Sequence, residues 1–286
     1  MKFSFNSLGY GSYNKWIPAY TLEETIKRIA NIGYNGIEIG AWRPHAWPYD
    51  LDNNKIRKIK KNIKEYNLEV SAICPVNHNL NLASSFKEER MAAIDYYLKC
   101  INLATELESD IVVCVPGWRI YGTLYSEAYK LSLDSVNTLA KEAEKNHIYI
   151  AIEAVNRSII NLINTSEQAY AMMKDISSSF VKLMLDTYHV MYEKENPVDV
   201  IELYNKDLVH IHCQDGIIEP PLRKVPGEGI FGFKSFFRKL KNIKYNRYLS
   251  VELWGENPDE LALKSYLALT DIINKLNGHQ EKINYS

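Results

Sequence analysis

Eight short apolar runs alternate with eight longer amphipathic segments along this 286-residue chain, and this alternation constrains the fold more than any other feature. The runs are rich in Ile and Val and are bounded by turn residues. Such near-continuous apolar character is typical of strands that are covered on both faces of a parallel sheet. We expect strands at residues 2–6, 36–39, 70–73, 111–115, 148–153, 181–186, 208–212 and 248–253.

The segments between the strands carry apolar side chains at helical spacing. In the segment 22–32, Thr21 and Glu24 form a capping-box pair at the start, and Gly33 provides a stop at the end. The other helices are expected at residues 53–66, 87–107, 126–145, 166–176, 198–203, 233–240 and 258–276.

This order of strands and helices predicts an α/β fold with a single (β/α)8 TIM barrel over residues 1–277 and a polar tail at 278–286. A doubly wound open sheet is the alternative. No G-x-G-x-x-G follows the first strand, however, so the dinucleotide-binding form of that fold lacks its main signal. In a barrel, functional side chains lie at the C-terminal ends of the strands, and a site is expected there.

The composition narrows the range of partners and compartments. With 34 Lys and Arg against 35 Asp and Glu, the net charge is −1, so we expect neither nucleic acid nor a membrane as a partner. The four cysteines are far apart and form no C-x-x-C pair, which favours buried free thiols in a reducing compartment. The first residues lack the apolar core of a signal peptide, so we expect a cytoplasmic protein.

The last four strands each end in or beside a side chain that can bind a metal ion: Glu153, Asp186, His212 and Glu252. Each one alone is more commonly a solvated or salt-bridged residue, but several carboxylates at the ends of apolar strands are costly to bury without a cation or hydrogen bonds. Three carboxylates and one imidazole suit Mn²⁺ best, with Mg²⁺, Co²⁺ or Zn²⁺ as alternatives. His210 shares the face of His212 but lies deeper, so it is expected to pack or to support that residue.

Other residues are candidates for contacts with a substrate. His189 lies on the loop after the sixth strand and Arg223 on the loop after the seventh. The alternative interpretations are a histidine at a helix start or on the surface, and a solvated loop arginine. Trp42 and Trp118 lie on strand–helix loops and are candidates for packing on the face of a sugar, or else for filling a core or a subunit interface.

Five segments resemble the sugar isomerase and epimerase family of xylose isomerase-like TIM barrels, above all its ketose 3-epimerases of the tagatose and psicose type. They are Ile-Glu-Ala-Val-Asn-Arg at 152–157, Leu-Asp-Thr-Tyr-His at 185–189, His-Ile-His at 210–212, Arg-Lys-Val-Pro-Gly-Glu-Gly at 223–229 and Val-Glu-Leu at 251–253. A further segment at 33–46, Gly-Tyr-Asn-Gly-Ile-Glu-Ile-Gly-Ala-Trp-Arg-Pro-His-Ala, looks like the fructoselysine 3-epimerase branch.

The resemblance implies a metal-dependent enzyme that epimerises C3 of a ketose or of a ketose derivative. By that resemblance, Glu153 and Glu252 bind the metal and also transfer protons through a metal-stabilised enediolate, and Asp186 and His212 complete the metal site. A dimer or tetramer is expected by analogy.

His189 and Arg223 match substrate contacts of the same family. One position departs from the pattern, because the family usually carries a second Glu six residues after the first, where this chain has Ile159. Recognition of that end of the sugar is therefore expected to differ from recognition of free psicose or tagatose.

Four other functions compete with this interpretation. An aldose–ketose isomerase and an inosose dehydratase use the same scaffold. An apurinic endonuclease-type hydrolase also uses the barrel, but it needs a three-zinc cluster, and this chain has only seven His and a near-neutral charge. A non-catalytic sugar-binding protein is the remaining alternative.

Overall fold

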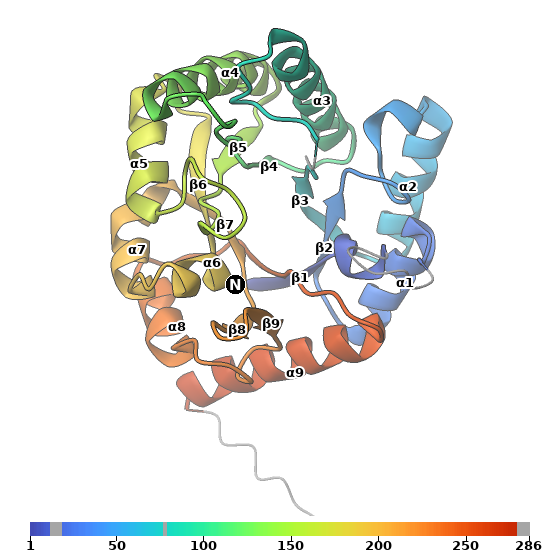
Figure 1. The fold of residues 1–286 in the computed structure, drawn as a ribbon. Helices are drawn as coiled ribbons and strands as arrows, with labels where there is room; N and C mark the ends of the chain where they lie inside the picture. The colour runs from blue at the N-terminus through green and yellow to red at the C-terminus, as the bar shows by residue number, and fades with distance from the viewer. Residues whose placement is uncertain (12–18, 77–78, 279–286) are drawn as a thin grey trace, which may run out of the picture.

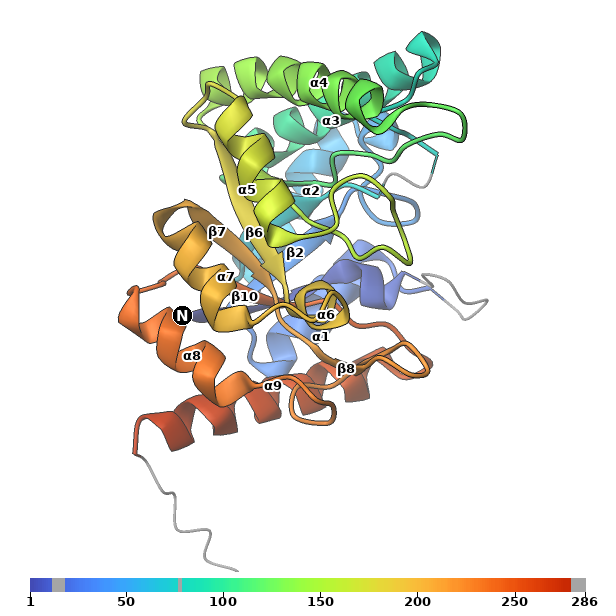
Figure 2. The ribbon, with the colours of Figure 1, turned by 60° about the vertical axis from the view of Figure 1, so that its left-hand side comes forward.

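The chain closes into a barrel of eight parallel strands (Figures 1 and 2). The computed structural model describes residues 1–11, 19–76 and 79–278. Around the barrel, hydrogen-bonded neighbours follow the order β1-β10-β7-β6-β5-β4-β3-β2. The barrel strands are β1 (Lys2–Asn6), β2 (Gly36–Gly40), β3 (Glu69–Cys74), β4 (Ile111–Cys114), β5 (Tyr149–Ile152), β6 (Val181–Asp186), β7 (Leu208–His212) and β10 (Tyr248–Val251).

In the described part of the chain, eight helices surround the barrel as an outer ring (Figure 1). They are α1 (Leu22–Ile32), α2 (Asn53–Glu65), α3 (Lys87–Glu106), α4 (Tyr125–Asn146), α5 (Ser166–Asp175), α7 (Pro197–Tyr204), α8 (Phe233–Asn242) and α9 (Pro258–Leu276). The predicted (β/α)8 barrel is confirmed, and the predicted ends of its strands and helices differ from the observed ends by at most two residues.

Local sequence signals explain where several helices begin and end. The capping box before α1 forms as predicted, with Thr21 accepting from the backbone of Glu24 and the Glu24 side chain accepting from the backbone of Thr21. Gly33 then ends the helix with a φ of 110°, a conformation that favours glycine. A second capping box starts α5, between Thr165 and Gln168.

The interior of the barrel is packed with side chains and is not a pore. Alternate residues of the strands point inward and form a small apolar cluster of their own, separate from the large core between strands and helices. The inward cluster consists of Ala72, Ile111, Val113, Ala151, Met184 and Val209. This cluster fills the interior of the barrel. Polar side chains that point inward nearer the carboxyl ends of the strands therefore lie at the mouth of the barrel.

Several short elements were not predicted. The loop after β6 contains the short helix α6 (Thr187–Tyr192), and the loop after β7 folds into a hairpin of β8 (Asp215–Ile217) and β9 (Leu222–Lys224). Both follow the carboxyl ends of their barrel strands (Figure 2). Single 3₁₀ turns occur at η1 (Ser7–Tyr10), η2 (Pro48–Asp50) and η3 (Asn205–Asp207).

Other expectations concern the cysteines, the membrane and the tail. All four cysteines are buried and free, as predicted. Within the described residues, no helix is both long enough and apolar enough to cross a membrane. The predicted tail at 278–286 lies outside the described residues from 279 onward.

Candidate active site

The four side chains that were predicted from the strand ends converge at one mouth of the barrel. The Nδ1 atom of His212 lies 3.5 Å from Glu153 Oε1, 3.7 Å from Asp186 Oδ2 and 3.4 Å from Glu252 Oε2. The tightest set is formed by Glu153, Asp186 and His212, whose ligand atoms all lie within 4.8 Å of one another. Glu252 follows β10, which lies on the other side of β7 from Glu153 and Asp186, and its Oε2 atom approaches His212 Nδ1 from that side.

The nitrogen at the centre of this cluster shows that the residues fit a cation. His212 Nδ1 is buried and has no hydrogen-bond partner among the described residues, because the surrounding carboxylate oxygens are too distant for a good hydrogen bond. Donor atoms that share one ion at about 2.0–2.2 Å stand about 3–3.5 Å apart, which is close to the observed spacing. An imidazole and three carboxylates at this spacing form a donor set for a divalent cation.

Glu38 is a site residue that the sequence analysis did not single out. It lies in β2, is fully buried, and its two carboxylate oxygens accept from His210 Nε2 and His212 Nε2, each at 2.9 Å. Its sequence signal was a charged residue in the middle of the apolar run Gly-Ile-Glu-Ile-Gly. The prediction that His210 lies below His212 and supports it agrees with this geometry.

Asp186 is held by several hydrogen bonds at the end of β6. Its Oδ1 atom accepts from the backbone N–H groups of Tyr188 and His189 at 2.7 and 3.1 Å, so it caps helix α6. The same oxygen accepts from Gln214 Nε2 at 2.7 Å. The other oxygen, Oδ2, is thereby directed to His212 and to the Arg223 guanidinium.

Arg223 reaches the centre of the cluster from the hairpin after β7. Its Nη1 atom lies 2.9 Å from Asp186 Oδ2 and 3.0 Å from Glu252 Oε2. Its guanidinium stacks over the rings of Tyr188 and Trp254, with 4.9 and 5.1 Å to the ring centroids. The hairpin therefore places a fixed positive charge beside two of the carboxylates, where sequence analysis predicted only a loop arginine over the pocket.

His189 also points into the cluster, but it lies on helix α6 and not on a loop as predicted. Asn156 sets the tautomer of this histidine. Because the Asn156 Oδ1 atom accepts from Ser158, its Nδ2 atom donates to His189 Nδ1 at 2.8 Å. A neutral His189 then carries its proton on Nε2, which lies 3.8 Å from Glu153 Oε1. Burial lowers the pKa of His189 to about 4, so the ring is neutral at neutral pH and offers an N–H donor to the site.

The carboxylates of the cluster differ in acidity. Burial raises the pKa of Glu153 to about 7, and the charges of Glu252 and Asp186 act in the same direction. Burial also acts on Glu252, but His212 and Arg223 outweigh it and lower the pKa of that carboxyl. In the cation-free cluster, Glu153 is therefore about half protonated at pH 7, whereas Glu252 is ionised.

A cavity of about 700 Å³ opens above the cluster. Glu153, His189, Arg223 and Glu252 form its polar floor, and mostly apolar side chains form the described part of its wall. Trp118 and Trp254 line this wall, and the contact of Trp118 with a substrate stays a prediction. Trp42 packs against Gly11 and Gly40 and is not among the described lining residues, so its contact with a substrate stays a prediction.

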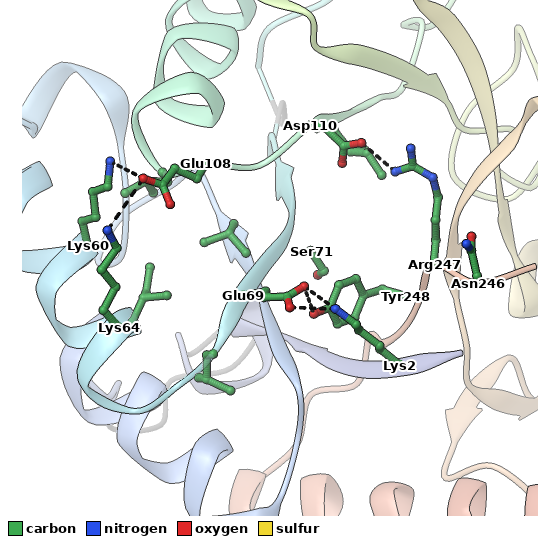
Figure 3. A pocket seen from close by; sticks show the side chains of 15 residues that line it. Lys2, Lys60, Lys64, Glu69, Ser71, Glu108, Asp110, Asn246, Arg247 and Tyr248 are labelled. Carbon is green, nitrogen blue, oxygen red and sulfur yellow. Dashed lines mark hydrogen bonds and ion pairs between the residues drawn. The ribbon is translucent and has the colours of Figure 1, made fainter.

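A second cavity, of about 480 Å³, lies at the opposite end of the barrel (Figure 3). Its charged side chains form ion pairs with one another: Lys2 with Glu69, Lys60 and Lys64 with Glu108, and Arg247 with Asp110. These paired and largely exposed charges contribute to the surface and leave no convergent acid or base. The cavity above His212 is therefore the candidate active site.

Comparison with known proteins gives the family. The xylose isomerase-like TIM barrel family matches residues 26–272. A D-psicose 3-epimerase of Enterocloster bolteae is 32% identical over 251 residues, covering 82% of this chain and 79% of the relative. A fructoselysine 3-epimerase of Shigella flexneri is 21% identical and covers 81% and 85% of the two chains. An inosose dehydratase of Clostridium beijerinckii is 23% identical and covers 86% and 87%.

Solved structures share the fold. A D-tagatose 3-epimerase-like protein superposes with a TM-score of 0.83 at 24% identity and covers 97% of this chain and 99% of its own. The IOLI protein with a bound zinc atom superposes with a TM-score of 0.81 at 21% identity and covers 96% and 99%. The chain is therefore a member of the xylose isomerase-like TIM barrel family and an enzyme of the isomerase class, akin to the ketose 3-epimerases of that family.

Proposed function

We propose that the chain is a metal-dependent ketose 3-epimerase. The observation that carries this proposal is the buried, unpartnered His212 Nδ1 atom, which faces three carboxylates at the floor of a cavity. A divalent cation would be held by His212 together with Glu153, Asp186 and Glu252. When bound, the cation would polarise the carbonyl of a ketose and stabilise the negative charge that develops when the neighbouring C–H loses its proton.

Two carboxylates on opposite flanks of the site can transfer protons to opposite faces of a sugar. Glu153 follows β5 and Glu252 follows β10, and two strands, β6 and β7, separate them in the barrel. Inverting the configuration at a carbon requires one group to remove the proton and another to return one from the other side. Glu153 and Glu252, one on each flank, can take these two roles in either order, as the base for one epimer and the acid for the other.

Arg223 and His189 would hold the oxygen atoms of the substrate. The Arg223 Nη2 and His189 Nε2 atoms lie 3.4 Å apart, so both donors converge on one point of the cavity floor. A ketose oxygen at that point would accept from both. The farther end of the substrate would meet a different surface from that of the related epimerases, because Ile159 lines the mouth of the cavity where they usually carry a carboxylate.

An inosose dehydratase is the second candidate, because one relative that covers most of the chain bears that name. The two reactions begin with proton removal beside a carbonyl and differ afterwards, since the dehydratase expels a hydroxyl group and the epimerase returns a proton. The cluster itself is compatible with either reaction.

Proton exchange in D₂O tests the proposal. We expect Mn²⁺-loaded protein to incorporate deuterium at C3 of a ketohexose and to produce its C3 epimer, as followed by NMR. Deuterium at C1 or C2 with an aldose as product would indicate an isomerase. Loss of water from an inosose would indicate the dehydratase, and binding of ketoses without exchange would contradict an enzymatic role.

Metal affinity is expected to increase with pH. Below pH 7 the Glu153 carboxyl, whose pKa burial raises to about 7, holds a proton that a cation must displace. Burial lowers the pKa of His212, but the charges of Glu38 and Glu252 outweigh burial and raise it, so a second proton competes in the same direction. Each displaced proton weakens binding about tenfold per pH unit, so with both protons titration calorimetry with Mn²⁺ should show about a hundredfold weaker affinity for each pH unit below 7. An affinity that is independent of pH between 5.5 and 7.5 would contradict this assignment.

A further inference from the structure

Glu38 and His210 have no role in the proton transfers, yet both are polar side chains that are fully buried inside the barrel. Glu38, His210 and His212 are each 0% exposed. Glu38 Oε1 accepts from His212 Nε2 at 2.9 Å, and Glu38 Oε2 accepts from His210 Nε2 at 2.9 Å. A buried charge that is fixed by two hydrogen bonds is costly compared with apolar packing, so a functional reason is required.

We propose that Glu38 and His210 act as a clamp that orients His212 for cation binding, which makes both of them positioning residues for the site. The proposal rests on the metal site of the proposed function. It adds that Glu38 and His210, which lie below the ligands inside the barrel, strengthen the affinity of that site for the cation.

The geometry fixes which nitrogen of His212 is left for a cation. An ionised carboxylate only accepts hydrogen bonds, so the Nε2 atom of His212 must carry a proton. A cation that displaces the second proton of the ring therefore meets the lone pair of Nδ1, which faces the carboxylates of the cluster. A hydrogen bond from the far nitrogen to a carboxylate also fixes the plane of the ring and makes the near nitrogen a stronger donor.

His210 completes the clamp. Its Nε2 atom donates to Glu38, and its Nδ1 atom has no hydrogen-bond partner among the described residues. The one polar contact of this ring is therefore with the second oxygen of Glu38. Both histidines lie on β7, so the Glu38 side chain, which comes from β2, is held at each oxygen and cannot rotate away from His212.

A competing interpretation makes Glu38 a cation ligand itself. Glu38, Cys74 and His212 also place their donor atoms within 4.8 Å of one another. This second site would use the His212 Nε2 lone pair, which the hydrogen bond to Glu38 excludes. The clamp therefore predicts one cation per chain, and the competing interpretation predicts a second one that depends on Cys74.

The test measures Mn²⁺ binding in the absence of substrate. Titration calorimetry of the Glu38→Gln variant should show an affinity about 10–100-fold weaker than that of the wild type, which is the usual effect of removing the partner of a ligand histidine. The Ser4→Ala variant is the matched control: Ser4 is equally buried in the neighbouring strand β1, but its hydroxyl has no hydrogen-bond partner among the described residues, and we expect its affinity to be unchanged. Thermal melting of the metal-free proteins verifies that each variant is folded.

His210→Phe provides a second variant, which keeps a ring in place and removes the donor to Glu38. It should weaken Mn²⁺ binding less than Glu38→Gln does, and the double variant should be no weaker than Glu38→Gln alone, because both changes break the same clamp. If Glu38→Gln does not fold, the loss in His210→Phe decides the question.

Three outcomes would overturn the clamp: wild-type affinity in both variants, two Mn²⁺ ions per wild-type chain with one lost in Cys74→Ser, or no Mn²⁺ binding by the wild type. Failure of the proposed function is distinguishable from failure of the clamp. A wild type that binds Mn²⁺ more tightly than Glu38→Gln but exchanges no proton of any ketose retains the clamp and loses the epimerase.

Discussion

Replacing either Glu153 or Glu252 by Gln is expected to lower the turnover of a ketose by roughly 10²–10⁴-fold, the usual contribution of a general acid or base, while the barrel stays folded. Glutamine has the shape of glutamate but cannot take up or release a proton at neutral pH. Because Glu153 and Glu252 lie on opposite flanks of His212, neither can replace the other. Both variants should therefore lose epimerisation.

The isotope pattern distinguishes a lost proton transfer from a damaged site. With one carboxylate left, the Glu252→Gln variant should still exchange the C3 proton of one epimer with D₂O without forming the other epimer. The Glu108→Gln variant is the control, because Glu108 lies at the opposite end of the barrel in an exposed pair with Lys60, and its activity should equal that of the wild type (Figure 3). Wild-type epimerisation by either site variant would disprove the scheme with two proton-transferring carboxylates.

Removing the cation is expected to abolish turnover altogether. Without it, the carboxylates of the cluster repel the negative charge that develops beside the ketose carbonyl, and the Arg223 guanidinium, which is already paired with Asp186 and Glu252, does not offset them. Dialysis against EDTA should therefore stop epimerisation, and Mn²⁺ or Co²⁺ should restore it.

Metal binding should also be visible in the stability of the protein. A cation at 100 times its dissociation constant stabilises the folded state by about 2.7 kcal/mol, so Mn²⁺ should raise the melting temperature of the metal-free protein. Full activity of protein that has been shown to contain no metal would contradict the metal role.

The residues at the strand ends could be predicted because position in a barrel determines function. Once the alternation of strands and helices is recognised, Glu153, Asp186 and His212 fall at the same mouth, since every parallel strand ends there. Their convergence thus follows from topology alone, and the structure brings them within a few ångströms of one another.

The residues below and beside this layer could not be predicted in the same way. Glu38 precedes the end of its strand by two residues, and whether it meets His212 depends on the tilt and stagger of strands that are far apart in the sequence. Asn156 acts by turning its amide toward His189, and only side-chain hydrogen bonds show that orientation. Such contacts depend on geometry that residue spacing does not encode.

The short elements after β6 and β7, which shape the cavity, could not be predicted from the sequence either. Helix α6 begins directly at the carboxyl end of β6, with Asp186 as its N-cap, so it shows no turn residues that separate it from the strand. The strands β8 and β9 are only three residues long each, too short for a periodic pattern. As a result, Arg223 was predicted as a loop residue, although it is held by a hairpin.

The central claim, that one divalent cation is bound by His212 and the carboxylates around it, is tested most directly by anomalous diffraction from crystals grown with Mn²⁺. We predict a single anomalous peak at the floor of the cavity, within about 2.0–2.6 Å of His212 Nδ1 and of oxygen atoms from Glu153, Asp186 and Glu252. A peak that lies elsewhere, or the absence of any peak at this floor with Mn²⁺ in excess, would contradict the account.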